Sequence, residues 1–216
     1  MRYHVAVARL ASLPAGLPPP AEALRPTRLA AGGTLHASEM GGDSGAAAPG
    51  RTAAVLVLIV PGEDGEARVV LTQRVDRGGH HSGEVSFPGG EAEPGDPDLV
   101  ATALREAAEE VGLDPSSAGV RVVGTLDPFH ITVSGYVVTP VLAIAERRPA
   151  LAPSPDEVTR ILEAPIRHFL PGAPIEVLVR EMPEWTLRFG AYRVEELVVW
   201  GATARILSQL GALLGD

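Results

Sequence analysis

Runs of apolar residues separated by turn-forming sequences extend from residue 51 towards the end of the chain. Thr52–Val60 is almost entirely apolar, a pattern that favours a strand buried on both faces. Pro61–Gly65 has turn chemistry and Ala67–Arg74 is apolar again, so the three segments predict a hairpin. Further strands are predicted at Glu84–Phe87, Val120–Leu126 and Tyr136–Ala145, with less regular patterns at Pro155–Leu162 and Trp185–Val199.

Two segments have the signals of helices. Asp96 is a suitable N-cap, Pro97 suits the first helical position, and Gly112 is a typical C-terminal glycine. The first helix therefore follows the short strand at Glu84–Phe87 closely. Gly201–Leu214 is amphipathic and predicts a terminal helix.

The first fifty residues differ in composition from the rest. Leu13–Pro20 is rich in proline, and Ala30–Gly50 is a tract of glycine, alanine and serine that buries too little apolar area to hold itself. The sequence predicts a flexible N-terminal arm or linker over residues 1–50, with at most one short strand or helix near Tyr3–Leu10. A single domain is expected over residues 51–216.

Bulk composition excludes several classes of protein. A length of 216 residues suits one domain with a full core. The net charge of −9 argues against a nucleic-acid duplex as partner, and the absence of cysteine excludes disulfides and thiolate chemistry. The longest apolar run, Ala53–Val60, is too short to span a bilayer, and the N-terminal residues lack the layout of a signal peptide. We therefore expect a cytoplasmic protein without a membrane partner.

Three glutamates gather on the first predicted helix. Residues three and four apart share a helix face, so Glu106 points the same way as Glu109 and Glu110. Their mutual repulsion disfavours the helix slightly, and a bound cation removes that cost. Carboxylate ligands suit Mg²⁺ or Mn²⁺, ions that hold phosphate oxygens and polarise an attacking water. For the helix taken alone, the alternative is a solvated acidic face.

The residues around these glutamates carry a family pattern. Phe87–Gly90 ends the short strand in a tight turn, where glycine lets the backbone approach a ligand closely. Together with Leu104–Leu113, this arrangement resembles the Nudix box, Gly-x5-Glu-x7-Arg-Glu-U-x-Glu-Glu-x-Gly-U, in which U is a bulky aliphatic residue. Ala107 is small for a U position, and the first glutamate of the pattern falls on Pro97, with Asp96 its equivalent after a one-residue insertion. The positions that match are Arg105, Glu106, Glu109, Glu110, Gly112 and Leu113.

With this one-residue insertion, the sequence resembles the coenzyme A diphosphatase branch of the Nudix family. Leu71–Arg74, followed by Gly83 and Phe87–Gly90, resembles the second signature of this branch. Gly79 stands where the branch has a spaced arginine, and Arg77 supplies a charge two residues away. Val70 and Val75 are further departures from the second signature. Two other segments are similar to the same branch, Thr132–Tyr136, running to Pro140, and Trp200–Leu207.

The resemblance covers roughly residues 51–214 and implies a fold and a set of roles. The implied fold is α+β, the Nudix α/β/α sandwich with a mixed sheet between helices. Glu157, in a later loop, is a candidate general base, Arg105 braces a glutamate, and Trp200 is expected to be a core anchor rather than a platform for a base. The implied catalytic residues are Glu106, Glu109, Arg105 and Glu157, the metal ligands Glu106, Glu109 and Glu110, and the substrate-binding residues Arg74, Arg77, Gly89 and Gly90.

The implied reaction is metal-dependent hydrolysis of the pyrophosphate of coenzyme A, or of a derivative, to 3′,5′-ADP and 4′-phosphopantetheine. Two alternatives stay open at this point. One is a Nudix pyrophosphatase for another nucleoside diphosphate derivative, such as ADP-ribose or a nucleotide sugar, and the other is a non-catalytic nucleotide-binding module. The expected partner is a small-molecule substrate, and a homodimer is the assembly we consider.

Overall fold

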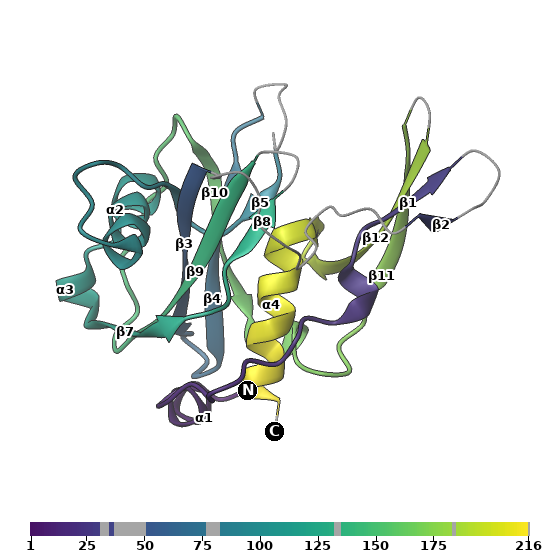
Figure 1. Ribbon diagram of the computed structural model, residues 1–216. Coiled ribbons are helices and arrows are strands. Elements are labelled where there is room, and N and C mark those ends of the chain that lie inside the picture. The colour runs from purple at the N-terminus through teal and green to yellow at the C-terminus, as the bar shows by residue number, and fades with distance from the viewer. Residues whose placement is uncertain (31–34, 37–50, 77–82, 132–134, 183–184, 216) are drawn as a thin grey trace.

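The computed structural model describes residues 1–30, 35–36, 51–76, 83–131, 135–182 and 185–215 (Figure 1). Its main sheet has the strand order β10-β4-β3-β9-β7. The central pair, β3 (Arg51–Pro61) and β9 (Tyr136–Ala145), is parallel, whereas its other neighbours pair antiparallel, so the sheet is mixed. β4 (Ala67–Arg74) lies between β3 and the edge strand β10 (Val158–Pro165), and β7 (Val120–Thr125) is the strand at the other end, with β8 (Phe129–Ile131) added on β9.

Helices cover both faces of this sheet (Figure 1). Alternate residues of β3 point to opposite faces. Leu56 and Leu58 pack with α2 (Leu99–Val111) and the short α3 (Pro115–Ala118), whereas Val57 and Ile59 pack with α1 (Tyr3–Arg9) and α4 (Gly201–Leu214). This arrangement confirms the predicted α+β sandwich. None of the helices in the described part of the chain is long and apolar enough to cross a membrane.

The predicted hairpin of β3 and β4 is closed only near its turn. The two strands pair from Ile59↔Val69 to Pro61↔Ala67 and then separate. Beyond that point β5 (Val85–Ser86) pairs with β4, and β6 (Gly89–Glu91) pairs with β3. The chain between the two short strands therefore lies in the gap, and this places a glycine turn in the middle of the sheet.

A second sheet stands beside α4 and projects away from the main sheet (Figure 1). Its strand order is β11-β12-β1-β2, and β13 pairs with β12. The segment predicted at Trp185–Val199 divides into two strands, because the chain turns at Glu195, which has a positive φ of 54°. The members are β1 (Thr27–Ala30), β2 (Leu35–His36), β11 (Glu176–Glu181), β12 (Trp185–Val194) and β13 (Leu197–Trp200).

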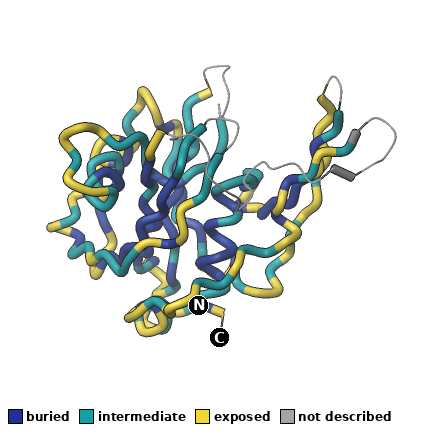
Figure 2. Tube along the Cα trace, in the orientation of Figure 1, coloured by how far each residue is buried: buried dark blue, intermediate teal, exposed yellow. Residues whose placement is uncertain are grey.

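The structure corrects the expected flexible arm over residues 1–30. Ala6, Leu10 and Leu24, the last in the 3-10 turn η1 (Glu22–Leu24), are buried in the core cluster beside α4. Figure 2 shows buried residues along the main sheet and α4. The N–H of Tyr3 donates to the carbonyl of Gly65, and β1 joins the second sheet. Helix α1 packs against β4 and α4, and η1 packs against β12 and α4, so these few apolar side chains join the segment to both sheets. Residues 31–34 and 37–50 lie outside the described residues.

A substitution of Leu24 measures how firmly this segment is held. Leu24→Ala removes a side chain with 0% exposure and should lower the free energy of unfolding by about 2–5 kcal/mol. Chemical denaturation followed by circular dichroism gives the value. Val179→Ala is the control, since Val179 is 58% exposed and its truncation should have little effect. Equal stabilities of the two variants would show that residues 1–30 do not contribute to the core.

Candidate active site

Helix α2 is fixed at both ends by its sequence. The carboxylate of Asp98 accepts a hydrogen bond from the N–H of Ala101 at 2.8 Å, so Asp98 is the N-cap and the helix begins at Leu99. The predicted N-cap at Asp96 was therefore wrong by two residues. Gly112 ends the helix in the left-handed region with φ of 65°, as predicted. The apolar residues Ala103, Ala107 and Val111 pack against the sheet and define the inner face of the helix.

Glu106 and Glu110 share that inner face, whereas Glu109 does not. One turn separates the first two, which lie about 40° apart around the axis, and Glu109 lies about 100° from Glu110. The Glu110 side chain is 3% exposed and that of Glu109 is 57% exposed. Glu106 and Glu110 line the same pocket, but Glu109 turns outward. The expected triad is thus a facing pair with a third carboxylate at the surface.

The glycine turn, Phe87–Gly90, bends at Pro88 and enters β6 at Gly89, and its two glycines contact both facing glutamates. The N–H of Gly89 donates to the carboxylate of Glu110 at 3.2 Å. A Cβ atom at Gly90 would lie 2.5 Å from the carboxylate carbon of Glu106. Only a residue without a side chain leaves room for that carboxylate, so the turn and the helix form one site.

Burial is the main electrostatic feature of this site. It raises the pKa of Glu110 to about 7, although Arg74, at 3.6 Å from the Glu110 carboxylate, and the Gly89 N–H act in the opposite direction. Burial also raises the pKa of Glu106, against the effect of Arg105. The charge of Glu157 adds to the rise in the pKa of both glutamates, which places it in the same field. Positive charge brought into the pocket would therefore stabilise three carboxylates at once.

Arg105 braces the outer side of the helix. Its Nε and Nη2 donate to the two carboxylate oxygens of Asp96 at 3.1 and 3.0 Å, and Nη1 donates to Glu106 at 2.9 Å and to Glu109 at 3.2 Å. The hydrogen bonds from Arg105 hold the pKa of Asp96 well below its usual range. Arg105 also donates to the carbonyl of Glu91 at 3.0 Å. It lies beside the pocket without lining it, a position that suits bracing rather than contact with substrate.

A conservative substitution tests this bracing. Arg105→Lys keeps the charge but loses the planar fork, so it should lower the free energy of unfolding by about 1–3 kcal/mol. Thermal unfolding measures the change. Arg121→Lys, at an exposed position on β7, is the matched control and should unfold like the wild type. If Arg105→Lys were equally stable, the fork to Asp96 would have no structural role.

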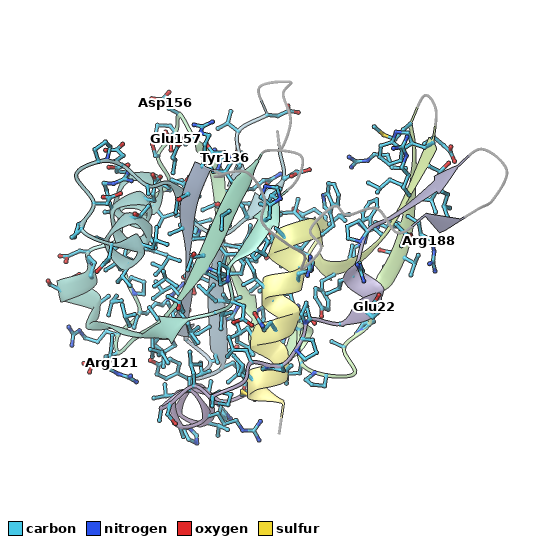
Figure 3. All side chains as sticks on the ribbon, viewed as in Figure 1. Glu22, Arg121, Tyr136, Asp156, Glu157 and Arg188 are labelled. Atoms are coloured by element: carbon cyan, nitrogen blue, oxygen red, sulfur yellow. The ribbon has the colours of Figure 1, made fainter. Side chains whose placement is uncertain are left out.

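Glu157 reaches the site from a loop that is tied to the end of α2. The N–H of Ser154 donates to the carbonyl of Glu110 at 2.8 Å, and the carbonyl of Glu157 accepts from the N–H of Val75 at 3.0 Å. Figure 3 shows Glu157 and Tyr136 at the same end of the main sheet. The loop position predicted for a general base therefore lies at the pocket.

A pocket of about 700 Å³ joins these elements. Arg74, Gly89 and Gly90 line it, together with Glu106, Glu110 and Glu157. Arg77, the other predicted phosphate-binding residue, lies outside the described residues. The lining residues that sequence reasoning did not single out as part of the site come from several elements and include Pro26, Glu91, Phe129, Tyr136, Trp200 and Arg205.

Glu91 has the clearest structural role among these additional residues. It accepts a hydrogen bond from the hydroxyl of Tyr136 at 3.0 Å and pairs with Arg51, whose guanidinium carbon lies 4.6 Å from the Tyr136 ring centroid. The contacts join β6 to β3 and β9 at the pocket, which Glu91 and Tyr136 line. The place of Glu91 directly after Gly90 is the signal in the sequence that could have indicated it.

The donor set of the pocket suits a divalent cation. Glu106 and Glu110 offer hard oxygen ligands on one face, and their desolvation disfavours two negative charges without a counter-ion. Within the described residues, no three acidic, histidine or cysteine side chains are arranged as a cage for a metal ion. Mg²⁺ is commonly held by one or two carboxylates and takes its other ligands from water and phosphate, so two facing glutamates are a suitable donor set for it.

An α+β sandwich with an acidic helix face against a glycine turn defines a class of domain, and the comparisons with known proteins agree. Residues 50–164 match the family model of the NUDIX domain, which is just over half of the chain. The chain belongs to the Nudix family.

Relatives with similar sequences carry the same family name. "Nudix hydrolase 22, chloroplastic" of Arabidopsis thaliana is 43% identical over 166 residues, which are 73% of this chain and 53% of that protein. "Nudix hydrolase 15, mitochondrial" of the same plant is 40% identical over 163 residues, with 73% and 56% covered. The chain thus spans about half the length of these two relatives. Nudix hydrolase NudL of Escherichia coli O7:K1 is 39% identical over 171 residues, with 76% of this chain and 83% of that protein covered.

One solved structure supports the fold. The MutT/nudix family protein from Enterococcus faecalis superposes with a TM-score of 0.51 at 15% sequence identity, and the match covers 78% of this chain and 63% of that one. At this identity the likeness concerns the fold alone.

Proposed function

We propose that this chain is a divalent-metal hydrolase that cuts the pyrophosphate linkage of coenzyme A or a close derivative. The observation that carries the proposal is the pair of desolvated glutamates, Glu106 and Glu110, that face one pocket beside the Gly89–Gly90 turn. Membership of the Nudix family supports the reaction type. Mg²⁺ or Mn²⁺ is the proposed ion.

In the proposed reaction a water oxygen attacks one phosphorus of the pyrophosphate. The bond from that phosphorus to the bridging oxygen breaks, and two phosphate monoesters, 3′,5′-ADP and 4′-phosphopantetheine, leave with release of a proton. A divalent cation held by Glu106 and Glu110 would neutralise phosphate oxygens and polarise the attacking water. Glu157 is the proposed acceptor of the proton, and Arg74 and the Gly89–Gly90 backbone are proposed to hold phosphate oxygens.

Three segments that resemble the coenzyme A diphosphatase branch meet at this pocket. Each contributes a residue to the lining, namely Arg74 from β4, Tyr136 from β9 and Trp200 from β13. Segments far apart in the sequence thus contribute to one binding surface. This convergence supports coenzyme A over other nucleoside diphosphate derivatives as the preferred substrate.

A substrate panel tests the proposal. The purified protein is incubated with Mg²⁺ or Mn²⁺ and with coenzyme A, ADP-ribose or a nucleotide sugar, and the products are separated by chromatography. We expect the highest kcat/KM for coenzyme A. Faster turnover of ADP-ribose would contradict the substrate, and no turnover of any compound would contradict the reaction and favour a binding module. Hydrolysis in oxygen-18 water identifies the phosphorus that is attacked.

Two further properties stay predictions. A cytoplasmic location is proposed from composition, and the words "chloroplastic" and "mitochondrial" in the names of two relatives apply to those proteins. The homodimer is tested by sedimentation velocity, which should give about twice the chain mass of 22.5 kDa.

A further inference from the structure

Trp200 lies on the wall of the pocket, although its sequence context indicated a core anchor. It is the last residue of β13 and directly precedes α4. Its side chain is half-buried and lines the same pocket as Glu106 and Glu110. Strand β13 packs beside β5, the short strand that leads into the glycine turn. Val199 and α4 pack on the opposite face of the main sheet from α2, so the indole lines the pocket on the side away from the acidic helix.

Neighbouring side chains fix the position of this ring. The Phe189 ring centroid lies 4.7 Å from that of Trp200 with an interplanar angle of 44°, and the guanidinium carbon of Arg180 lies 5.1 Å from the indole centroid. Phe189 is only 4% exposed, and Arg180 does not line the pocket. Both contacts come from the second sheet, so they support the indole from outside the pocket. An aromatic ring held in this way binds a ligand without losing much conformational freedom.

We infer that Trp200 is the platform on which the purine base of the substrate stacks. The inference rests on the proposed function, because it assigns the nucleotide half of the substrate to one side of the same pocket. A fixed indole offers a flat π surface, which suits another flat ring better than a flexible, branched pantetheine chain. Arg205, on the first turns of α4, lines the same wall and gives it positive charge towards the phosphates of a nucleotide.

This wall is built outside the part of the chain that matches the family model. Trp200 and Arg205 follow residue 164, and Pro26, which lines the same pocket, precedes residue 50. The family segment thus supplies the acidic helix and the glycine turn, and flanking segments supply the proposed base platform. Arg180 is assigned as a positioning residue, which acts through the indole and does not touch the base.

Fluorescence provides a direct test, because the chain has two tryptophans, Trp185 and Trp200. In the Trp185→Phe variant, Trp200 is the sole reporter. The variant is titrated in Mg²⁺ buffer with 3′,5′-ADP or with 4′-phosphopantetheine, neither of which contains the pyrophosphate bond. We expect saturable quenching by 3′,5′-ADP and little change with 4′-phosphopantetheine. Quenching by 4′-phosphopantetheine alone would place the other half of the substrate on Trp200 and overturn the assignment, as would no quenching by either compound.

Substitutions give the second readout. Trp200→Leu should weaken binding of 3′,5′-ADP and raise KM by about 5- to 150-fold, the range for loss of one base stack, and Trp200→Phe should restore most of the affinity. Arg180→Met should raise KM by a smaller factor and leave kcat near the wild-type value. Calorimetry of 3′,5′-ADP binding and steady-state kinetics measure these effects. Unchanged affinity in Trp200→Leu, with a melting temperature like that of the wild type, would overturn the inference.

The two proposals fail in distinguishable ways. Suppose that coenzyme A is hydrolysed, that 3′,5′-ADP does not quench the fluorescence of Trp200, and that Trp200→Leu binds 3′,5′-ADP as tightly as the wild type. The proposed reaction then stands and the proposed base platform is wrong. If 3′,5′-ADP binds and quenches but no pyrophosphate is cleaved, the platform stands and the hydrolase proposal is wrong.

Discussion

Glu110→Gln should reduce pyrophosphate hydrolysis by about 1,000-fold or more while the protein stays folded. The change removes one of the two facing carboxylates proposed to hold the metal, and metal-ion catalysis is worth several kcal/mol, at tenfold in rate for each 1.36 kcal/mol. The amide keeps an oxygen that accepts the N–H of Gly89. Steady-state kinetics with coenzyme A and saturating Mg²⁺ measure the loss.

Although Glu110→Gln should lose activity, we expect it to be at least as stable as the wild type in metal-free buffer above pH 7. Burial raises the pKa of Glu110 to about 7 from 4.5, so the folded state holds this proton at a pH where the unfolded chain has released it. Wild-type stability in metal-free buffer therefore carries a cost from Glu110 that appears as the pH rises from about 4.5 towards 7. Glu110→Gln lacks that cost, and its melting temperature at pH 8 with EDTA should equal or exceed that of the wild type.

Glu109→Gln is the matched control, because Glu109 lies one residue away with a 57% exposed side chain. Its loss of activity should be much smaller than that of Glu110→Gln. Equal losses in the two variants would contradict the division into an inner pair and an outer glutamate. A Glu110→Gln protein with wild-type activity would contradict the proposed metal site.

Gly90→Ala should cost about 100-fold in activity with little change in the melting temperature. The new Cβ would lie 2.5 Å from the Glu106 carboxylate, which is the mobile end of a side chain and moves away at small cost. Displacement of a catalytic group by about 1 Å can reduce the rate by about 100-fold. Kinetics and thermal unfolding of the purified variant measure the two quantities.

Two other glycines serve as comparisons for this variant. Gly95→Ala changes an exposed turn with no atom within 4 Å of the new Cβ, so activity and stability should both be retained. Gly89→Ala meets the backbone of Ala54 at 2.4 Å, at a residue with φ of +157°, and should destabilise the fold. If Gly90→Ala lost stability to the same extent as Gly89→Ala, its effect would be structural, and the argument about Glu106 would fail.

The sequence predicted best those elements whose signals are local. The bounds of β9 and α4 follow from long apolar or amphipathic patterns, and Gly112 ends α2 as its position indicated. The start of α2 was misplaced because Asp96 and Asp98 are equally good caps in isolation. The choice depends on Arg105, which pairs with Asp96 and leaves Asp98 to cap the helix.

Other features depend on contacts that the sequence pattern does not contain. Strands β5 and β6 are too short to show a period, so the opening of the β3–β4 hairpin was not predicted. Leu10 and Leu24 are single apolar residues in a segment of low complexity, and only the tertiary structure shows them in the core. Helix geometry accounts for the outward turn of Glu109, which the three-and-four spacing rule alone did not distinguish.

The residues of the site also divide into those that are close in the sequence and those that only the tertiary structure brings together. Glu106, Glu110 and the Gly89–Gly90 turn lie close in sequence, and the structure brings them together. Glu157 reaches them through the sheet topology, which the spacing of residues does not reveal. The place of Trp200 depends on the second sheet, because its ring contacts Phe189 and Arg180, which come from other strands of that sheet.

Strand β12 joins segments from opposite parts of the chain, since Thr27 of β1 pairs with Arg188. Contacts between residues so far apart form slowly, because a long loop must close before they become favourable. During synthesis on the ribosome, Thr27 emerges long before its partner strand. The acidic helix and the glycine turn can therefore fold before the wall that carries Trp200, which assembles only when the last strands have been made.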